Sequence, residues 1–352
     1  MAKAQPEAEV PARQPASGRI AQPRGRRTRT APLPVAPRSA VLHARIFPSH
    51  APRQDSTGRR FAGPADAETP MPYDFDPPAA LLELCRLMAR RPLLVLTGAG
   101  ISTPSGIPAY RDKDGVRHGR APMTYQEFTA SSAARKRYWA RSMIGWPRMR
   151  EARPNAAHRA LARLAAGRRI AGLITQNVDG LHQEAGSEEV IELHGNLHRV
   201  RCLDCGKRLW RSEIQAELEE KNAYLRGVEA ILAPDGDARL AEAHLEGFRI
   251  PWCPCCGSDL LKPDVVFYGE GVPAEQTEAA SRSIERAPAL LVVGSTVMTY
   301  SSFRLCRSIA ERGRPLAAIN QGAMRAEGLL NLKIERPCEQ VLPWLTEWLE
   351  NA

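Results

Sequence analysis

Four cysteines of the chain are spaced as metal ligands. Cys202 and Cys205 form one CxxC pair, Cys253 and Cys256 form another, and a glycine follows each pair. Each pair can turn two thiolates onto one cation, and two pairs complete the closed tetrahedral shell of structural zinc. Cys255 is a rival ligand, but only Cys256 keeps the two-residue spacing and the following glycine. The spacing therefore predicts one structural zinc per chain, with unligated or redox-active thiols as the alternative.

A glycine-rich turn from Gly98 to Gly106 follows a short apolar run at 92–97. Such a turn after a strand lets the backbone approach a pyrophosphate at the start of a helix. The spacing is not GxGxxG, however, and tight packing alone could explain the glycines. Tyr110 and Arg111 follow the turn and supply an aromatic ring and a guanidinium. These two side chains suit a mobile cover over a planar cationic ring and phosphates.

Polar side chains follow the next two apolar runs. Gln176, Asn177 and Asp179 come after the second run, and His194 comes after the third, just before a glycine. Doubly wound sheets bind their ligands at the carboxyl ends of strands. An imidazole placed there could take a proton from a ribose hydroxyl near neutral pH. The histidines interpreted instead as ordinary hydrogen-bonding groups are His158, His182, His198 and His244.

Short apolar runs alternate with helical patterns along most of the chain. The runs predicted to be buried parallel strands are 92–97, 169–175, 190–193, 289–293 and 315–319. A helix is predicted over 154–166, with Pro154 in its first turn and Gly167 after its end. This alternation predicts an α/β fold with a doubly wound parallel sheet. The cysteine-bearing block breaks the rhythm, so we expect a larger part formed by 71–200 and 263–350 and a zinc-binding insertion at about 201–262.

The first 70 residues differ in composition from the rest. They hold 12 Lys and Arg against 5 Asp and Glu, which is most of the net charge of +10, and 11 of the 29 prolines. Such a segment cannot bury enough apolar surface to fold, so it is expected to be disordered. We favour an organelle-type leader, or a true start at Met71, over a basic arm that touches phosphate or anionic lipid.

Other sequence features bear on location. No apolar run reaches the about 18 residues that cross a bilayer, so no membrane span is expected. No signal-peptide core opens the sequence, and metal-binding thiols must be reduced, which makes the cytoplasm the default location.

An ordered set of motifs resembles the sirtuin family of NAD-dependent protein lysine deacylases. It spans Leu94 to about Pro343 and consists of GAGIST-x-SGIP-x-YR, TQNVDGLH, the ELHGN histidine, both CxxC pairs, KPDVVFYGE, VVGST and AIN. The chain is most similar to class II members in RYWAR at 137–141, GWP at 145–147, LDCG at 203–206, LAPDGD at 232–237 and KPDVV at 262–266. The resemblance implies a Rossmann-like large domain, a small zinc-binding domain, and a cleft for NAD and an acyl-lysine peptide.

The resemblance also implies roles for individual residues. The cofactor-binding residues would be Gly98, Ala99, Gly100 and Ser102 at the phosphates, Tyr110 and Arg111 on the covering loop, Gln176, Asn177 and Asp179 at the nicotinamide and its ribose, and Gly294, Ser295, Thr296, Asn320, Gln321, Gly322 and the Cys338 backbone at the adenosine half. The edge to which a peptide adds as a strand would be Val265, Val266, Phe267 and Tyr268. The implied catalytic residues are His194 and Asn177, and His194 would act as general base on the ribose hydroxyls. The implied products are free lysine, nicotinamide and acyl-ADP-ribose.

Two features leave the substrate open. Ala109 stands where many relatives have Asp, so one contact near the covering loop is missing or replaced. Tyr138 and Arg141 show a Y-x-x-R spacing that selects acidic acyl groups in another sirtuin class; the alternative is a packed Tyr138 and a solvated Arg141.

Two other functions compete with deacylation. One is mono-ADP-ribosyl transfer to proteins. The other is a zinc-stabilised binding module that uses the basic arm on nucleic acid. This second function is the least expected, because the chain beyond the first 70 residues is close to neutral.

Overall fold

The computed structural model describes residues 78–110, 112, 116, 122–228, 240 and 242–351. Within them, a six-stranded parallel sheet has the order β3-β2-β1-β7-β8-β9. Its strands are β1 (Leu93–Thr97), β2 (Ile170–Thr175), β3 (Ile191–Glu192), β7 (Leu290–Val293), β8 (Leu316–Ile319) and β9 (Leu332–Ile334). The predicted α/β fold with a doubly wound parallel sheet is confirmed. The strand order reverses at β1, between β2 and β7, where such sheets bind their ligands.

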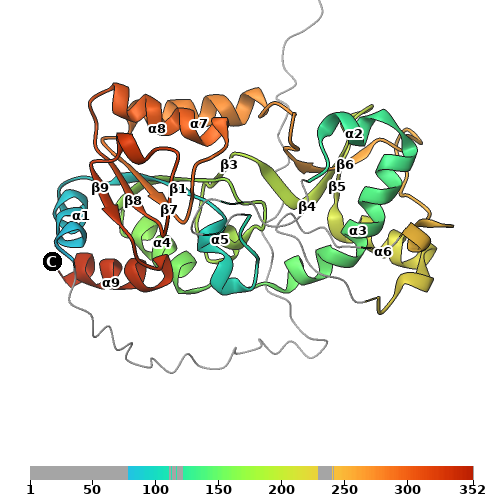
Figure 1. Cartoon of the computed structure of the whole chain (residues 1–352), viewed down its shortest axis with the longest axis horizontal. Coiled ribbons are helices and arrows are strands. Elements are labelled where there is room, and N and C mark those ends of the chain that lie inside the picture. Colours follow the sequence, from blue (N-terminus) through green and yellow to red (C-terminus); the bar gives the residue numbers. More distant parts are fainter. Residues whose placement is uncertain are drawn as a thin grey trace, which may run out of the picture. The chain divides into compact units, whose positions relative to one another are not determined.

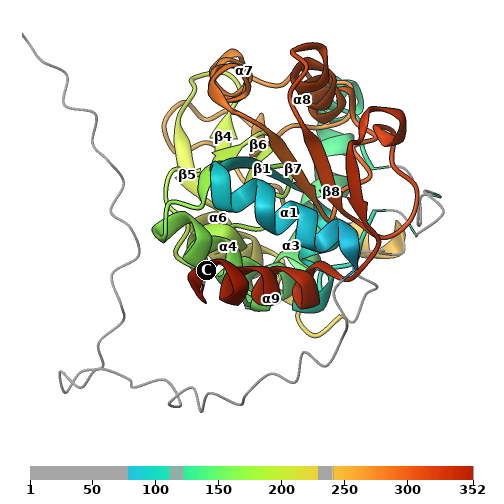
Figure 2. The same cartoon turned by 90° about the vertical axis from the view of Figure 1, so that its left-hand side faces the viewer.

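Helices cover both faces of this sheet (Figures 1 and 2). One face carries α1 (Ala79–Arg90), α4 (Ala156–Ala166) and α9 (Cys338–Asn351), and the other carries α7 (Ala274–Arg286) and α8 (Tyr300–Glu311). Alternate side chains of a strand point to opposite faces, so Val95 packs with the first group of helices and Leu96 with the second. Burial on both faces explains why β1 is apolar almost throughout.

The predicted elements differ from the observed ones mainly at their ends. The helix predicted from Pro154 begins at Ala156, because the Asn155 side chain accepts a hydrogen bond from the Ala157 backbone N–H and so caps the helix. It ends before Gly167, as predicted. Strand β9 was not predicted, since three residues are too few to show a period.

A second sheet is antiparallel, with the order β5-β4-β6. Its strands are β4 (Gly195–Cys202), β5 (Arg208–Trp210) and β6 (Leu261–Val265), and its helices are α2 (Tyr125–Ala130), α3 (Ser132–Glu151) and α6 (Arg211–Lys221). Phe128 and Trp139, from the stretch assigned above to the larger part, pack in the core of this smaller sheet. The Trp139 indole N–H donates to the Leu261 carbonyl at 3.1 Å. The Arg135 guanidinium pairs with Asp259 at 2.7 Å, so α3 is fastened to the segment that leads into β6.

The remaining short elements are helix α5 (Leu181–Glu184) and the 3-10 turns Ala99–Ile101, Thr103–Ser105, Ala223–Leu225, Glu242–Leu245 and Glu327–Leu329. Among the described helices, none combines the length and the apolar character needed to cross a membrane. The predictions for the basic segment 1–70 and for Arg111 lie outside the described residues.

Candidate active site

A cavity of about 860 Å³ opens at the carboxyl ends of β1, β2, β7 and β8 and is bounded on another side by the segment that follows β6. It brings together most of the residues singled out in the sequence. Those that line it are Gly98, Ala99, Gly100, Tyr110, Gln176, Asn177, His194, Val265, Val266, Phe267, Tyr268, Gly294, Ser295, Thr296, Asn320, Gln321 and Cys338. Ala109 and Tyr138 line it as well.

Three predicted residues, Ser102, Asp179 and Gly322, are not among the described residues that line the cavity. Ser102 and Asp179 are buried, and the Ser102 hydroxyl donates to the Asp179 carboxyl at 2.7 Å. Burial raises the pKa of Asp179, against the effect of hydrogen bonds from Leu181 and Ser102. Gly322 offers its carbonyl to the Asn320 amide at 3.4 Å. Ser102 and Asp179 therefore support the wall from behind.

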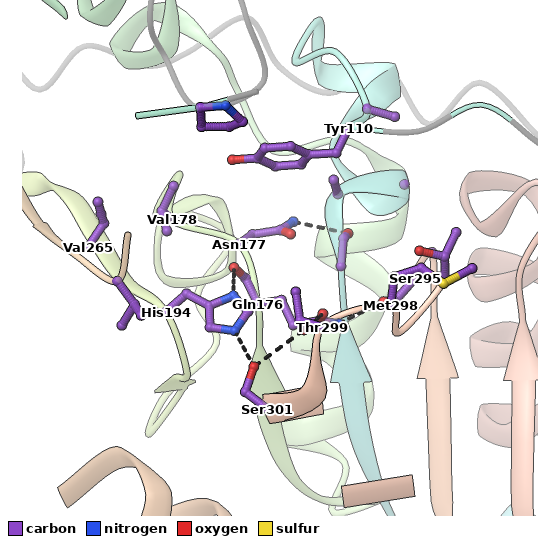
Figure 3. A pocket seen from close by; sticks show the side chains of 18 of the residues that line it. Tyr110, Gln176, Asn177, Val178, His194, Val265, Ser295, Met298, Thr299 and Ser301 are labelled. Carbon is purple, nitrogen blue, oxygen red and sulfur yellow. Dashed lines mark hydrogen bonds between the residues drawn. The ribbon is translucent and has the colours of Figure 1, made fainter. Parts of the chain in front are cut away.

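Asn177 is oriented by that support. Its side-chain nitrogen donates to the Gly98 carbonyl at 3.1 Å and to the Ser102 hydroxyl at 3.0 Å. Because the nitrogen is committed to the wall, the amide oxygen is the group left to face the cavity (Figure 3). Gln176, its neighbour, donates to the Ser295 hydroxyl at 2.7 Å and so ties the loop after β2 to the loop after β7.

The glycines of the loops after β1 and β7 allow two backbones to touch. A Cβ on Gly100 would lie 2.8 Å from the Gly294 carbonyl oxygen, and a Cβ on Gly98 would lie 2.6 Å from the Ser295 Cβ. The Gly98 and Gly100 N–H groups donate to the carbonyls of Val293 and Gly294. At these two positions glycine therefore serves close packing, and that packing shapes the floor of the cavity.

His194 stands at the junction of the two sheets. Its Nδ1 lies 3.1 Å from the Gln176 carbonyl oxygen, and its Nε2 lies 2.8 Å from the Ser301 hydroxyl (Figure 3). A carbonyl only accepts, so Nδ1 carries the hydrogen and Nε2 keeps its lone pair. Burial lowers the pKa of His194 to about 4, and the bond to the Gln176 carbonyl opposes that shift. The imidazole is therefore neutral at neutral pH, as a general base must be.

The glycine after His194 is required by a close contact. Gly195 has φ +83°, and a Cβ there would lie 2.0 Å from the Asp264 carbonyl oxygen. Gly195 pairs with Val265, and the Val266 N–H donates to the His194 carbonyl at 2.9 Å. The predicted peptide-binding edge therefore lies directly beside the predicted base.

A buried ion pair holds this edge in place. The Lys262 ammonium, 4% exposed as a residue, lies 3.0 Å from Glu270 Oε2 and 4.7 Å from the centroid of the Phe267 ring. The same carboxylate oxygen accepts the Phe267 N–H at 2.8 Å. Tyr268 and Tyr300 are 41% and 58% exposed and stand along the cavity lining.

Tyr138 and Arg141 do not converge on the cavity. The Tyr138 ring packs against Phe128 and Phe267, with centroids 5.4 and 5.3 Å apart, and lines the cavity. Arg141 is absent from the lining among the described residues. The arrangement supports the packed-tyrosine interpretation over an acid-selective pair.

The four predicted zinc ligands gather at one point. The sulfur atoms of Cys202, Cys205, Cys253 and Cys256 all lie within 4.8 Å of one another, with Cys202–Cys256 at 3.6 Å and Cys205–Cys253 at 3.7 Å. A tetrahedral ion with Zn–S bonds of about 2.3 Å separates its sulfurs by about 3.8 Å. The donor set therefore fits zinc, and Cys255 stands outside it.

The sequence did not single out Ser301 or Thr299. Both line the cavity, and the Ser301 hydroxyl lies 3.3 Å from that of Thr299. Ser301 is 107 residues from His194, and a serine at the start of a helix carries no spacing signal. Only the tertiary structure shows it as a partner of the imidazole.

Two further histidines are buried beneath the glycine loop. The rings of His158 and His182 have centroids 4.9 Å apart; Nε2 of His158 lies 3.5 Å from Ser102 Oγ, and Nε2 of His182 lies 2.9 Å from Thr97 Oγ1. Burial lowers the pKa of His158 to about 4, helped by Arg159, and that of His182 to about 3, helped by His158. Both rings are neutral in the folded protein at neutral pH.

Acid should therefore unfold the protein early. Below about pH 6.5 the unfolded chain binds protons that the folded chain does not, so the free energy of unfolding falls as the pH drops from 6.5 toward 4. Each such histidine contributes a slope of up to about 1.4 kcal/mol per pH unit. Urea midpoints at several pH values measure this loss. His182→Gln, whose amide can still donate to Thr97, should flatten the dependence, and an unchanged slope would exclude this cause.

Comparison with known proteins identifies the family. The sequence model of the Sir2 family matches residues 98–301. The chain belongs to the Sir2 family. It is 59% identical over 266 residues to "NAD-dependent protein deacetylase 3" of Pseudomonas syringae pv. tomato, covering 76% of this chain and 95% of that protein. It is 51% identical over 255 residues to "NAD-dependent protein deacetylase" of Xanthomonas campestris pv. campestris, covering 72% and 87%.

Solved Sir2 structures share the fold of this chain. "Sir2-p53 peptide-NAD+" has a TM-score of 0.62 at 29% identity and covers 77% of this chain and 98% of its own. "Structural Basis for the Mechanism and Regulation of Sir2 Enzymes" has a TM-score of 0.61 at 30% identity, with the same coverage.

Proposed function

We propose that this Sir2 protein is an NAD-dependent protein lysine deacylase. It removes acetyl or longer acyl groups from lysines of proteins and yields nicotinamide and O-acyl-ADP-ribose. The observation that carries the proposal is a neutral His194 imidazole, held at a cavity where polar strand ends meet the Val265–Tyr268 edge. The names of relatives at 51–59% identity support it.

The residues present fit NAD. A cavity of about 860 Å³ is within the range of pockets that enclose a whole small molecule. The loops after β1, β7 and β8 would hold the phosphates and adenosine, with Gln176 and Asn177 at the nicotinamide ribose. Bound NAD would supply the ribose that takes up the acyl group on a hydroxyl oxygen, and nicotinamide as the leaving group.

The chain's own residues would orient the reactants and move one proton. The Asn177 amide oxygen would face the nicotinamide ribose, and His194 Nε2 would take a proton from a ribose hydroxyl. Apolar lining from Val178, Leu197 and Val265 would exclude water from the reacting bond. The zinc would be structural, since four thiolates leave no open position for a water.

The proposal extends to the substrates, the location and the sirtuin class of the protein. Acyl-lysine proteins or peptides are the proposed partners. We place the protein in the cytoplasm because the thiolate ligands must stay reduced. The class II assignment rests on the RYWAR and GWP motifs.

Release of nicotinamide tests the proposal. Purified protein should release it only when NAD and an acyl-lysine peptide are both present, and the deacylated peptide should appear in equal amount. The same peptide with an unmodified lysine is the matched control. A panel of acetyl, longer and dicarboxylic acyl groups on one peptide identifies the preferred chain. NAD label retained on protein, with no deacylated peptide, would indicate mono-ADP-ribosyl transfer instead.

A further inference from the structure

The basic nitrogen of His194 is already occupied. An imidazole nitrogen has one lone pair in the ring plane, and the Ser301 hydroxyl lies 2.8 Å from Nε2. Because Nδ1 holds the ring hydrogen toward Gln176, Ser301 must be the donor to Nε2. A substrate hydroxyl can therefore reach the lone pair only if Ser301 gives it up.

Ser301 has a second acceptor for its hydrogen. Thr299 Oγ1 lies 3.3 Å from Ser301 Oγ (Figure 3). The Thr299 hydroxyl lies 2.7 Å from Ser302 Oγ, so it can give its own hydrogen away and accept from Ser301. Ser301 can thus leave Nε2 while its hydroxyl hydrogen keeps an acceptor.

We propose that Ser301 is a positioning residue for His194: its hydroxyl fixes the neutral ring with Nε2 toward the cavity and releases Nε2 by turning its hydrogen onto Thr299. The inference rests on the proposed function of His194 as a base. Once Nε2 has taken a proton, its N–H can donate back to Ser301 Oγ, while the Ser301 hydrogen stays on Thr299. One hydroxyl therefore serves both protonation states of the ring.

Within the part of the chain that the structure describes, hydrogen bonds and no ion pair hold the His194 ring. Both ring nitrogens of His194 are engaged, by Gln176 and by Ser301. The charged side chains that line the same cavity, among the described residues, are Asp112, Glu270, Arg304, Arg336 and Glu339. Glu270 is held by Lys262 and by the Phe267 N–H. Among the described residues, Ser301 is the side chain that contacts Nε2.

The first test needs no activity. In protein labelled with ¹⁵N at histidine, the Nε2 resonance of His194, assigned with His194→Gln, should report an unprotonated nitrogen that accepts a hydrogen bond. Ser301→Ala should move that resonance toward the position of a free lone pair, and Ser301→Thr should restore it. Ser302→Ala removes a buried hydroxyl one residue away and should leave it unmoved. An Nε2 signal that does not respond to Ser301→Ala overturns the proposal, whatever reaction the protein catalyses.

The second test is the pH profile of kcat/KM. A donor to Nε2 favours the neutral ring, so its loss in Ser301→Ala should raise the pKa of His194 from about 4. The acid limb of the kcat/KM profile should shift to higher pH by about one unit in Ser301→Ala, which corresponds to the loss of one hydrogen bond. In Ser301→Thr the limb should lie at the wild-type pH again. Thr299→Val keeps the donor and removes its alternative acceptor, so kcat should fall while the Nε2 resonance stays. A lower kcat in Ser301→Ala with an unshifted limb would mean a packing role only and would contradict the proposal.

Discussion

His194→Gln is expected to lower the rate of deacylation by about 10²–10⁴-fold, the usual contribution of a general base. Glutamine is close to histidine in size and can keep a hydrogen bond to the Gln176 carbonyl, but it cannot take up a proton. Affinity for NAD should stay near that of the wild type, because the ring contacts Gln176 and Ser301 and leaves the floor of the cavity intact. Product formation by mass spectrometry and NAD binding by calorimetry measure the two effects separately.

His198→Gln is the matched control. His198 lies on β4, four residues after His194, its Nε2 donates to the Asp179 carbonyl at 2.8 Å, and it does not line the cavity. This variant should deacylate at a rate close to the wild type. Equal losses in both variants would mean that any change in β4 disturbs the site, and the assignment of His194 as base would fail.

The acidic side of the wild-type profile gives an independent check. Because burial holds the pKa of His194 near 4, the base is unprotonated throughout the neutral range. Activity should be lost on acidification as the pH falls toward 4, well below the ordinary histidine value of about 6.5. If kcat/KM of the folded protein instead falls with a midpoint near pH 6.5, the His194 ring is more exposed to water than the structure shows.

Local signals explain what the sequence predicted. Cys202, Cys205, Cys253 and Cys256 could be assigned because each pair forms one short turn, so spacing alone determines which sulfurs can share an ion. Strands β1, β7 and β8 of the parallel sheet were found because burial on both faces makes them apolar almost throughout. The ends of those strands then gave the polar residues of the site.

Contacts between distant segments explain the rest. Helix α3 packs in the smaller core through Tyr138 and Trp139, but it also buries Arg135, whose charge is paired with Asp259, 124 residues away. No helical pattern in the sequence reveals such a partner. Ser301 escaped prediction for the same reason, since its role depends on an imidazole 107 residues away in the chain.

Loss of the zinc should be the most damaging change to the smaller sheet. Structural zinc contributes on the order of 10 kcal/mol to the folding of zinc-finger peptides. Cys205→Ser should therefore lose the metal and lower the unfolding temperature by roughly 10 °C or more, since each kcal/mol is worth about 2–4 °C in a domain of this size. Elemental analysis should find one zinc per wild-type chain and well under one in the variant.

Cys255→Ser is the matched control, because it removes a nearby thiol that is not one of the four proposed zinc ligands. Cys255 is exposed and sits between two ligands, yet its sulfur is outside the four-sulfur cluster. This variant should keep both its zinc and its unfolding temperature; if it behaves like Cys205→Ser, the four-cysteine assignment is wrong.

Loss of the zinc should also abolish deacylation, while binding of NAD should still be detectable. Two ligands lie at and just after the end of β4, and the other two lie before β6; His194 directly precedes β4 and Val265 ends β6, whereas the loops after β1 and β7 belong to the other sheet.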